Sequence, residues 1–286
     1  MTRFSATSHA NVTRIAIAQM QSGIDPAVNA QTVADLAERS AGEGAAILFT
    51  PEMTGLLDRD RKRAASSIVG EDSDLTLAKA RDAASKYGLM IALGSLALKG
   101  EEDGLWVNRS LLIESNGDIA ARYDKLHMFD VDLDGGESWR ESNAYQAGRA
   151  VTVAQTPAGK LGLSICYDIR FPALFEELGK ARCDLIAVPA AFTVPTGQAH
   201  WHVLQRARAI EASAYVVAAA QVGQHADGRT TYGHSLVVDP WGEVLLDLGG
   251  DGPNIGFAEI DAERIEQVRS QVPSLANRRP IPRLVP

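Results

Sequence analysis

The sequence predicts a single α/β domain built around mixed β-sheets. Short apolar runs of strand length alternate with segments whose apolar residues recur at helical spacing along the chain. Hydrophobic residues make up 45% of the 286 residues and charged residues 22%, the composition of a globular protein with a sizeable core. No low-complexity tract, short repeat or linker divides the chain, so we expect one domain.

The first half supplies the clearest element boundaries. Residues 14–19 are an apolar run that suits a buried strand, and Asp25-Pro26 then caps a helix that Gly42 ends. Residues 45–49 form the next strand, and a second helix runs through residues 77–87 to Gly88. Three strands follow at residues 89–98, 107–114 and 118–123, the last two joined by the hairpin signal Asn116-Gly117.

The second half repeats this alternation. Strands are expected at residues 150–155 and 160–165, and Pro172 begins a helix that ends near residue 181. A strand at 184–188 and a long helix at 198–213 precede four strands at 215–221, 234–239, 243–248 and 255–259. Beyond Val272, four prolines exclude regular structure, and this tail either contacts a partner subunit or stays loose.

Charge and composition exclude several classes of partner. The formal charge of −8 would repel nucleic acid and anionic membrane surfaces alike. The short basic cluster at residues 59–63 does not offset this charge and is interpreted as a solvated face. No apolar run is long enough to span a membrane, and residues 1–12 lack the apolar core of a secretory signal. We therefore expect a cytoplasmic protein without nucleic-acid or membrane partners.

Cys166 is the leading candidate for a reactive group. It follows an apolar run and precedes Asp168, Arg170 and Pro172, so it lies at a turn from a strand into a helix. Unpaired backbone N–H groups at such a junction favour a thiolate and the oxyanion that it generates. The other cysteine, Cys183, precedes an apolar run and is interpreted as structural, although a bridge between the two stays open. A free thiol suits a reducing compartment.

Two further residues complete a set that suits amide hydrolysis. Glu52 follows the strand at residues 45–49, where α/β sheets gather functional groups at the carboxyl ends of strands. A carboxylate there can accept the thiol proton and later donate it to the leaving group. Lys125 follows another predicted strand and can stabilise thiolate and oxyanion. The histidines, by contrast, show no ligand spacing, so we expect neither a metal nor another cofactor.

Three segments resemble the signatures of the nitrilase, or carbon–nitrogen hydrolase, superfamily. They are Pro-Glu at residues 51–52, Asp-Lys-Leu-His-Met-Phe-Asp at 124–130 and Ile-Cys-Tyr-Asp-Ile-Arg-Phe-Pro at 165–172. The resemblance implies an αββα sandwich of two mixed sheets flanked by helices, with the hydrolase domain at residues 13–270 and terminal extensions at 1–12 and 271–286. It also implies that Glu52, Lys125 and Cys166 are base, oxyanion stabiliser and nucleophile. Family members often add a second glutamate, and here Glu141 matches better than Glu137.

Within this superfamily, the stretches around residues 199–211, 215–221 and 232–242 resemble the Nit branch, above all deaminated-glutathione amidases and the related ω-amidases. The resemblance implies a small amide substrate that bears a carboxylate, an oxyanion contact from the backbone N–H of Tyr167, and a homodimer or higher homo-oligomer. The cation expected near the substrate is Arg170, although an ion pair with Asp168 is the alternative role. The other pocket candidates lie at a loop-to-helix junction: Phe192, Thr193, Thr196 and His200.

Other activities share the same catalytic residues. An ω-amidase of keto-acid amides, a nitrilase and an N-carbamoyl-amino-acid hydrolase are the alternatives, and a non-catalytic scaffold is a remote one. A thiol–disulfide oxidoreductase is disfavoured because the chain has no Cys-x-x-Cys pair. The charged residues of the long helix, Arg206, Arg208 and Glu211, are interpreted as structural ion pairs.

Overall fold

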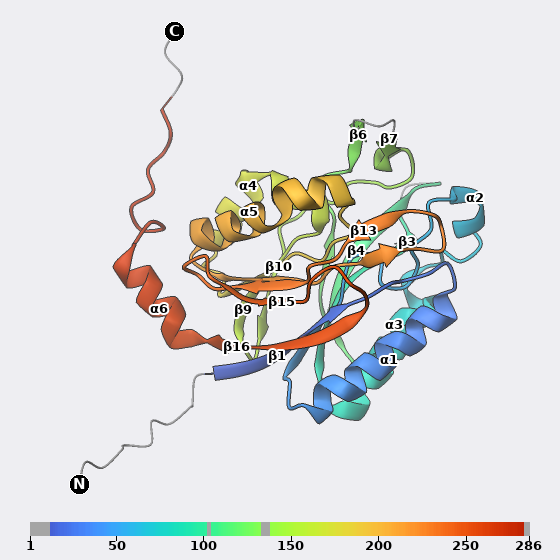
Figure 1. The fold of residues 1–286 in the computed structure, drawn as a ribbon, viewed down its shortest axis with the longest axis horizontal. Helices are drawn as coiled ribbons and strands as arrows, with labels where there is room; N and C mark the ends of the chain where they lie inside the picture. The colour runs from blue at the N-terminus through green and yellow to red at the C-terminus, as the bar shows by residue number, and fades with distance from the viewer. Residues whose placement is uncertain (1–11, 102–103, 133–137, 283–286) are drawn as a thin grey trace.

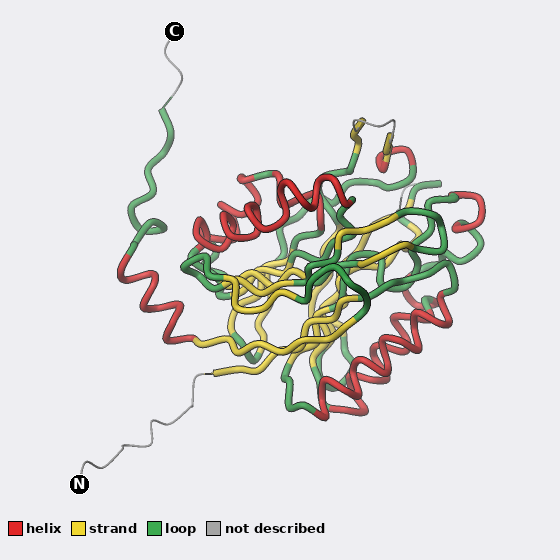
Figure 2. The backbone as a smooth tube through the Cα atoms, in the orientation of Figure 1, coloured by secondary structure: helices red, strands yellow, loops and turns green. Residues whose placement is uncertain are grey.

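Two six-stranded mixed sheets form the centre of the protein, and helices cover their outer faces (Figures 1 and 2). The computed structural model describes residues 12–101, 104–132 and 138–282. The first sheet has the order β16 (Asn254–Asp261), β1 (Val12–Gln19), β2 (Ile47–Phe49), β3 (Met90–Lys99), β4 (Trp106–Ile113) and β5 (Ile119–Asp124). The second has the order β15 (Val244–Asp247), β14 (Leu236–Val238), β11 (Tyr215–Ala218), β10 (Leu185–Ala187), β9 (Gly159–Leu163) and β8 (Val153–Thr156). This is the expected αββα sandwich.

The side-chain alternation of the strands explains the layers. On β1, Ile15 and Ile17 point into the core between the sheets, while Ala16 and Ala18 belong to a second cluster beneath α1 (Pro26–Gly42) and α3 (Leu75–Tyr87). Successive side chains of a strand face opposite sides of the sheet, so one strand serves two cores. Helices α4 (Pro172–Lys180) and α5 (Val194–Ala212) cover the outer face of the second sheet, as α1 and α3 cover the outer face of the first (Figure 1).

Strand direction places several loops at one edge of the molecule. In the first sheet β1, β2 and β3 are parallel, and β5 runs in the same direction as β3 because each is antiparallel to β4. In the second sheet β9, β10 and β11 are parallel. The loops that follow β2, β5, β9 and β10 carry residues 50–54, 125–129, 164–166 and 188–193, and carboxyl ends of parallel strands are where α/β folds build sites.

A kink in β3 makes room for the first of these loops. The register of β3 against β4 shifts between Leu93 and Leu96, and Gly94 lies in the interval. A Cβ atom on Gly94 would come within 2.0 Å of the Thr50 carbonyl oxygen, so only glycine lets the loop after β2 approach so closely. The Gly94 N–H in turn donates to Thr50 Oγ1 at 2.9 Å.

The predicted elements are present, with a few differences at their ends. Helix α5 begins at Val194 rather than near residue 198, because Pro195 occupies its first turn, where a missing N–H costs nothing. Helix α6 (Ala262–Gln271) was not predicted, and neither were the short elements α2 (Arg61–Ala64), η1 (Glu71–Ser73), η2 (Glu141–Asn143), η3 (Cys166–Arg170) and the hairpins β6 (Asp130–Asp132)–β7 (Ser138–Arg140) and β12 (Val222–Gln224)–β13 (Thr230–Tyr232). Among the described residues, no helix combines the length and apolarity needed to cross a membrane.

Candidate active site

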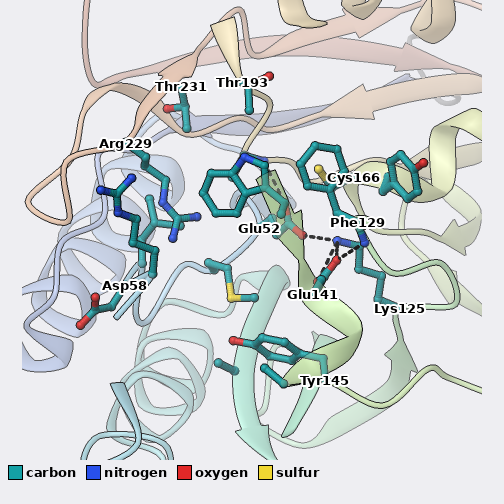
Figure 3. A pocket seen from close by; sticks show the side chains of 18 of the residues that line it. Glu52, Asp58, Lys125, Phe129, Glu141, Tyr145, Cys166, Thr193, Arg229 and Thr231 are labelled. Atoms are coloured by element: carbon teal, nitrogen blue, oxygen red, sulfur yellow. Dashed lines mark hydrogen bonds and ion pairs between the residues drawn. The ribbon is translucent and has the colours of Figure 1, made fainter. Parts of the chain in front are cut away.

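The three residues expected to act together meet in one cavity of about 590 Å³ between the loops at the sheet edge. Glu52 comes from the loop after β2, Lys125 from the end of β5, and Cys166 from the turn after β9; all three are buried. Figure 3 shows their side chains directed toward one another, together with Glu141 from η2. The structure therefore brings together all four residues that the sequence analysis named for catalysis. Glu137 lies outside the described residues.

Lys125 is the centre of the polar network. Its Nζ donates to Glu52 Oε1 at 2.9 Å and to both oxygens of Glu141, at 3.0 and 2.9 Å. Asn108 on β4 donates to Glu52 Oε1 at 2.9 Å and to Glu141 Oε1 at 3.3 Å, and the Phe129 N–H donates to Glu141 Oε2. Burial disfavours the charge of Lys125, but the Glu141 and Glu52 carboxylates outweigh it and raise its pKa well above 10.5. The lysine is thus held as a cation.

The thiol of Cys166 is not poised as a free thiolate. Burial raises its pKa well above 9.0, the Glu52 charge raises it further, and Lys125 opposes both. The expectation of a strand-end environment that favours the thiolate is therefore wrong for the resting site. Glu52 lines the same cavity, and its charge acts on the thiol, so this carboxylate is placed to receive the proton when Cys166 attacks. Both cysteines are free, which excludes a bridge between them.

The turn that carries Cys166 is held in an unusual conformation. Cys166 has φ 48°, in the left-handed region that non-glycine residues rarely adopt, and it begins helix η3. Its own N–H is bonded to the Pro189 carbonyl, 2.9 Å away. Tyr167, the second residue of the helix, lies in the first turn, where N–H groups have no partner within a helix. An oxyanion beside Sγ would meet such donors and the Lys125 ammonium.

Asp168 fixes this turn, a role that its place in the sequence did not indicate. The fully buried carboxylate accepts hydrogen bonds from Tyr123 Oη at 2.6 Å, from the backbone and ring of His127 at 3.0 and 2.7 Å, and from the Ile165 N–H at 2.9 Å. It therefore ties the lysine loop to the cysteine turn. An Asp168–Arg170 ion pair, the alternative role for Arg170, is absent among the described residues because these donors occupy the carboxylate.

The predicted substrate-contacting residues nearly all line the cavity: Tyr167, Arg170, Phe192, Thr193 and Thr196. His200 is not among the lining residues; its Nδ1 lies 3.3 Å from Arg170 Nη1. The guanidinium of Arg170 also lies over the rings of Tyr167 and Phe192. Residues 59–63 are all exposed, as a solvated face requires, and Arg59 and Arg61 also line the cavity.

Helix α5 supports the turn that carries Cys166 through hydrogen bonds of its arginines. Arg208 is buried, and its Nε and Nη2 donate to the Ile169 carbonyl in η3 at 2.9 and 2.7 Å, while Nη1 pairs with Glu211 at 2.7 Å. Arg206 Nε donates to the Gly242 carbonyl at 2.7 Å. The structural interpretation of these charges is confirmed.

One group of histidines does gather, contrary to the expectation of scattered residues. His202 Nε2 lies 2.8 Å from Asp247 Oδ2, and His234 Nδ1 lies 3.0 Å from Asp247 Oδ1. The ligand atoms of these three residues fall within 4.8 Å of one another. They come from α5, the segment before β14 and the end of β15, so only the fold unites them. The three satisfy one another by hydrogen bonding, and the lack of a catalytic metal stays a prediction.

Residues 14–270 match the carbon-nitrogen hydrolase family, and the chain belongs to that family. A Yersinia enterocolitica protein named deaminated glutathione amidase is 45% identical over 211 residues, which cover 72% of each chain. The crystal structure of the Caenorhabditis elegans NitFhit protein is similar with a TM-score of 0.87 and 38% identity, covering 94% of this chain and 65% of that one.

Saccharomyces cerevisiae Nit3, a member of branch 10 of the nitrilase superfamily, has a TM-score of 0.82 and 28% identity over 94% of this chain and 97% of its own. These comparisons confirm the Nit-branch resemblance and the sandwich fold. The chain is a carbon–nitrogen hydrolase that acts on amides, which excludes the scaffold alternative.

Proposed function

We propose that this enzyme hydrolyses a small amide that bears a carboxylate, of the deaminated-glutathione kind, through a thioester on Cys166. The observation that carries the proposal is the network of Lys125, Glu52 and Glu141, which lines one cavity together with Cys166. The name of the Yersinia relative supports the substrate class. Arg170, free of Asp168 and facing the cavity, supplies a cation for a substrate carboxylate.

The reaction follows from the contacts. Glu52 takes the proton of Cys166 while Sγ forms a bond to the amide carbon, and the carbonyl π electrons move to oxygen. Lys125 Nζ and the Tyr167 N–H stabilise that oxyanion. When the tetrahedral intermediate collapses, the C–N bond breaks and Glu52 returns the proton to the leaving nitrogen, leaving a thioester. Glu52 then deprotonates a water that attacks the thioester carbon. The C–S bond breaks, Glu52 returns the proton to Sγ, and the acid product leaves the restored enzyme.

Glu141 is proposed to position Lys125 rather than to transfer protons. Both of its oxygens accept from Nζ, and the Phe129 N–H fixes the carboxylate in place. With Glu141 holding the ammonium, Glu52 keeps its second oxygen for the reaction. That oxygen, Oε2, accepts the Ala191 N–H at 3.0 Å.

A substrate panel tests the proposal. Purified wild-type enzyme is assayed for release of ammonia or amine from a deaminated-glutathione analogue, a keto-acid ω-amide, a nitrile and an N-carbamoyl amino acid, with Cys166→Ala as control. We expect the analogue to give the highest kcat/KM and Cys166→Ala to fold normally without activity. Highest kcat/KM for the ω-amide, the nitrile or the carbamoyl compound would favour that alternative, and an active Cys166→Ala would refute the nucleophile.

Location and assembly are part of the same proposal. Two free cysteines suit a reducing cytoplasm. A homodimer through the outer helices is supported by exposed apolar side chains on α5, Val203 and Ile210. Light scattering at several protein concentrations tests the dimer, and a monomer at all of them would contradict it.

A further inference from the structure

A cluster of titratable side chains lies outside the catalytic cavity. It consists of His202 on α5, His234 in the segment before β14 and Asp247 at the end of β15, and none of the three lines the cavity. Helix α5 packs against β13 and β14, and β15 is the edge strand of the second sheet (Figure 1). The cluster therefore joins the outer helix to that edge.

The ligand atoms of the three side chains converge. His202 Nε2 lies 2.8 Å from Asp247 Oδ2, and His234 Nδ1 lies 3.0 Å from Oδ1 and 3.1 Å from Oδ2 of the same carboxylate. All three side chains offer a ligand atom within 4.8 Å of the others. Neighbouring ligand atoms of a tetrahedral zinc ion, bound at about 2.0–2.1 Å, stand about 3.3 Å apart. The spacings between the imidazoles and the carboxylate thus need to widen by only about half an ångström or less.

The backbone around His234 holds its side chain in place. Its φ is 55°, in the left-handed region that non-glycine residues adopt only where the surroundings impose it. The His234 N–H donates to the Gly249 carbonyl at 2.7 Å, and the His234 carbonyl accepts the Nε1–H of buried Trp201 at 2.8 Å. Because Trp201 precedes His202, this bond helps to fix both histidines relative to each other. The Tyr232 ring stacks on the His234 ring, with 4.3 Å between centroids, and restricts its rotation.

The carboxylate is oriented as well, and solvent reaches the cluster. The Gly249 N–H donates to Asp247 Oδ1 at 2.9 Å. The side chains of His202, His234 and Asp247 are 34%, 26% and 30% exposed, so an ion can enter from water and a water molecule can complete its coordination. Two imidazole nitrogens and one carboxylate oxygen suit zinc and similar transition-metal ions, whereas Mg²⁺ and Ca²⁺ prefer oxygen ligands alone.

We propose that His202, His234 and Asp247 form a binding site for a divalent transition-metal ion of the zinc type. The ion takes the place of the two hydrogen-bonding protons between the imidazoles and the carboxylate, and each neutral imidazole carries its proton on its other ring nitrogen. It connects three segments that are distant along the chain, so it stabilises the fold. It takes no part in the reaction at Cys166, and the site does not depend on the proposed function.

Calorimetric titration tests the site. The full chain carrying Cys166→Ala, which removes a thiol that could itself bind zinc, is stripped of metal and titrated with zinc chloride. We expect one equivalent to bind. In the same background, His202→Gln is expected to weaken zinc binding by about tenfold or more, because even partners that only orient a ligand contribute about 10–100-fold. Glutamine is a good helix former and its amide can donate to Asp247, so this variant should fold.

Two further variants make the titration specific. Asp247→Asn removes the charge of the third ligand and is expected to weaken zinc binding as well. His200→Gln removes an exposed histidine of the same helix that does not belong to the cluster, so it should bind zinc as tightly as its parent. No zinc binding by the parent, or unchanged affinity in His202→Gln, would overturn the inference and leave the three residues as a hydrogen-bonded cluster.

Thermal unfolding gives an independent readout. An ion that binds only the folded chain raises its melting temperature. We expect zinc to raise the melting temperature of the Cys166→Ala protein, and to raise it less or not at all when His202→Gln is added. Mg²⁺ at the same concentration should leave the melting temperature unchanged, because imidazole donors do not suit it. Equal stabilisation by Mg²⁺ would indicate a nonspecific effect of charge and would contradict the proposed site.

Discussion

The Glu52 carboxylate affects the protonation of the Cys166 thiol. Burial raises the pKa of this thiol and the Glu52 charge raises it further, which keeps the thiol protonated at rest, and we propose that the same carboxylate is its base. Such an arrangement stores the nucleophile in an unreactive form until a substrate carbonyl is in place. It also predicts that the two properties of Glu52, raising the thiol pKa and accepting its proton, can be separated by one substitution.

Glu52→Gln is expected to lower the Cys166 pKa, because the anion that raises it is gone and Lys125 remains. The variant should alkylate with iodoacetamide at lower pH than wild type, while amide hydrolysis falls by about hundredfold or more without its base. Mass spectrometry of labelling rate against pH measures the shift. Cys183, whose pKa burial raises to about 12, is the internal reference. An unchanged or higher labelling pKa would contradict this account of the thiol.

Lys125→Met is expected to reduce kcat by about hundredfold or more through loss of the oxyanion contact. It should also lower the free energy of unfolding by about 3 kcal/mol, since the buried Glu52 and the partly buried Glu141 lose their cation. In wild type the raised Lys125 pKa means that this stabilisation is present below pH 10.5 and is lost as pH rises through the higher folded value. Denaturant unfolding between pH 7 and 11 tests this: an equally steep alkaline loss in Lys125→Met would contradict it.

Helix η3 is the element on which the site depends most. It is only five residues long, begins with a strained cysteine and has few bonds of its own, so its shape comes from its neighbours. Arg208 of α5 holds its carbonyl side and Asp168 ties it to the loop of Lys125. The His127 ring stacks on the Phe171 ring with 3.6 Å between their centroids, which adds a further contact between the loop of Lys125 and η3.

Asp168→Asn is expected to loosen this junction. Its oxygens receive donors from Tyr123, His127 and Ile165, and an amide NH₂ would face a donor in place of an acceptor. We expect about 2 kcal/mol less stability and a lower kcat with little change in KM. Thermal unfolding and steady-state kinetics measure both, with the exposed turn variant Asp118→Asn as control. Wild-type kcat in Asp168→Asn would show that the turn does not need this carboxylate.

Across the whole molecule, buried glutamines join the two sheets at the edge that carries the site. Gln221, beyond β11, donates to Ser22 Oγ at 2.8 Å and to the Glu52 carbonyl at 2.9 Å, and its Oε1 accepts the Ser22 N–H. Gln19 on β1 accepts the Ser235 N–H and donates to the carbonyls of Gly249 and Gly252. The relative position of Glu52 and Cys166 therefore depends on contacts between residues about 200 positions apart.

Gln221→Leu preserves the approximate volume but removes the hydrogen-bond partner of the Ser22 N–H and of the Glu52 carbonyl. We expect a loss of about 2–3 kcal/mol in the free energy of unfolding and a lower kcat, because the Glu52 loop loses an anchor. Gln224→Ala, at an exposed position of the next strand, should be neutral. If Gln221→Leu unfolds like wild type, the glutamine does not hold the sheets together.

The sequence by itself determined the order of the strands of the two main sheets and of helices α1, α3, α4 and α5, because the spacing of apolar residues and the capping signals are local. It also identified Glu52, Lys125, Cys166 and Glu141, which stand in or beside short motifs at strand ends. The predicted start of helix α5, residue 198, was wrong: the helix begins at Val194, because Pro195 lies in its first turn and does not interrupt it. The catalytic roles of the four residues stay predictions.

Only the tertiary structure decided how the site works. Asp168, Asn108 and Gln221 carry no sequence signal that separates them from ordinary polar residues, and their partners lie on other elements. The raised thiol pKa comes from burial and from Glu52, which lies in a distant segment of the chain. Likewise His202 and His234 share the Asp247 carboxylate only after α5 packs on the second sheet. Burial and charge pairing between distant segments are properties of the packed fold, and a linear pattern does not contain them.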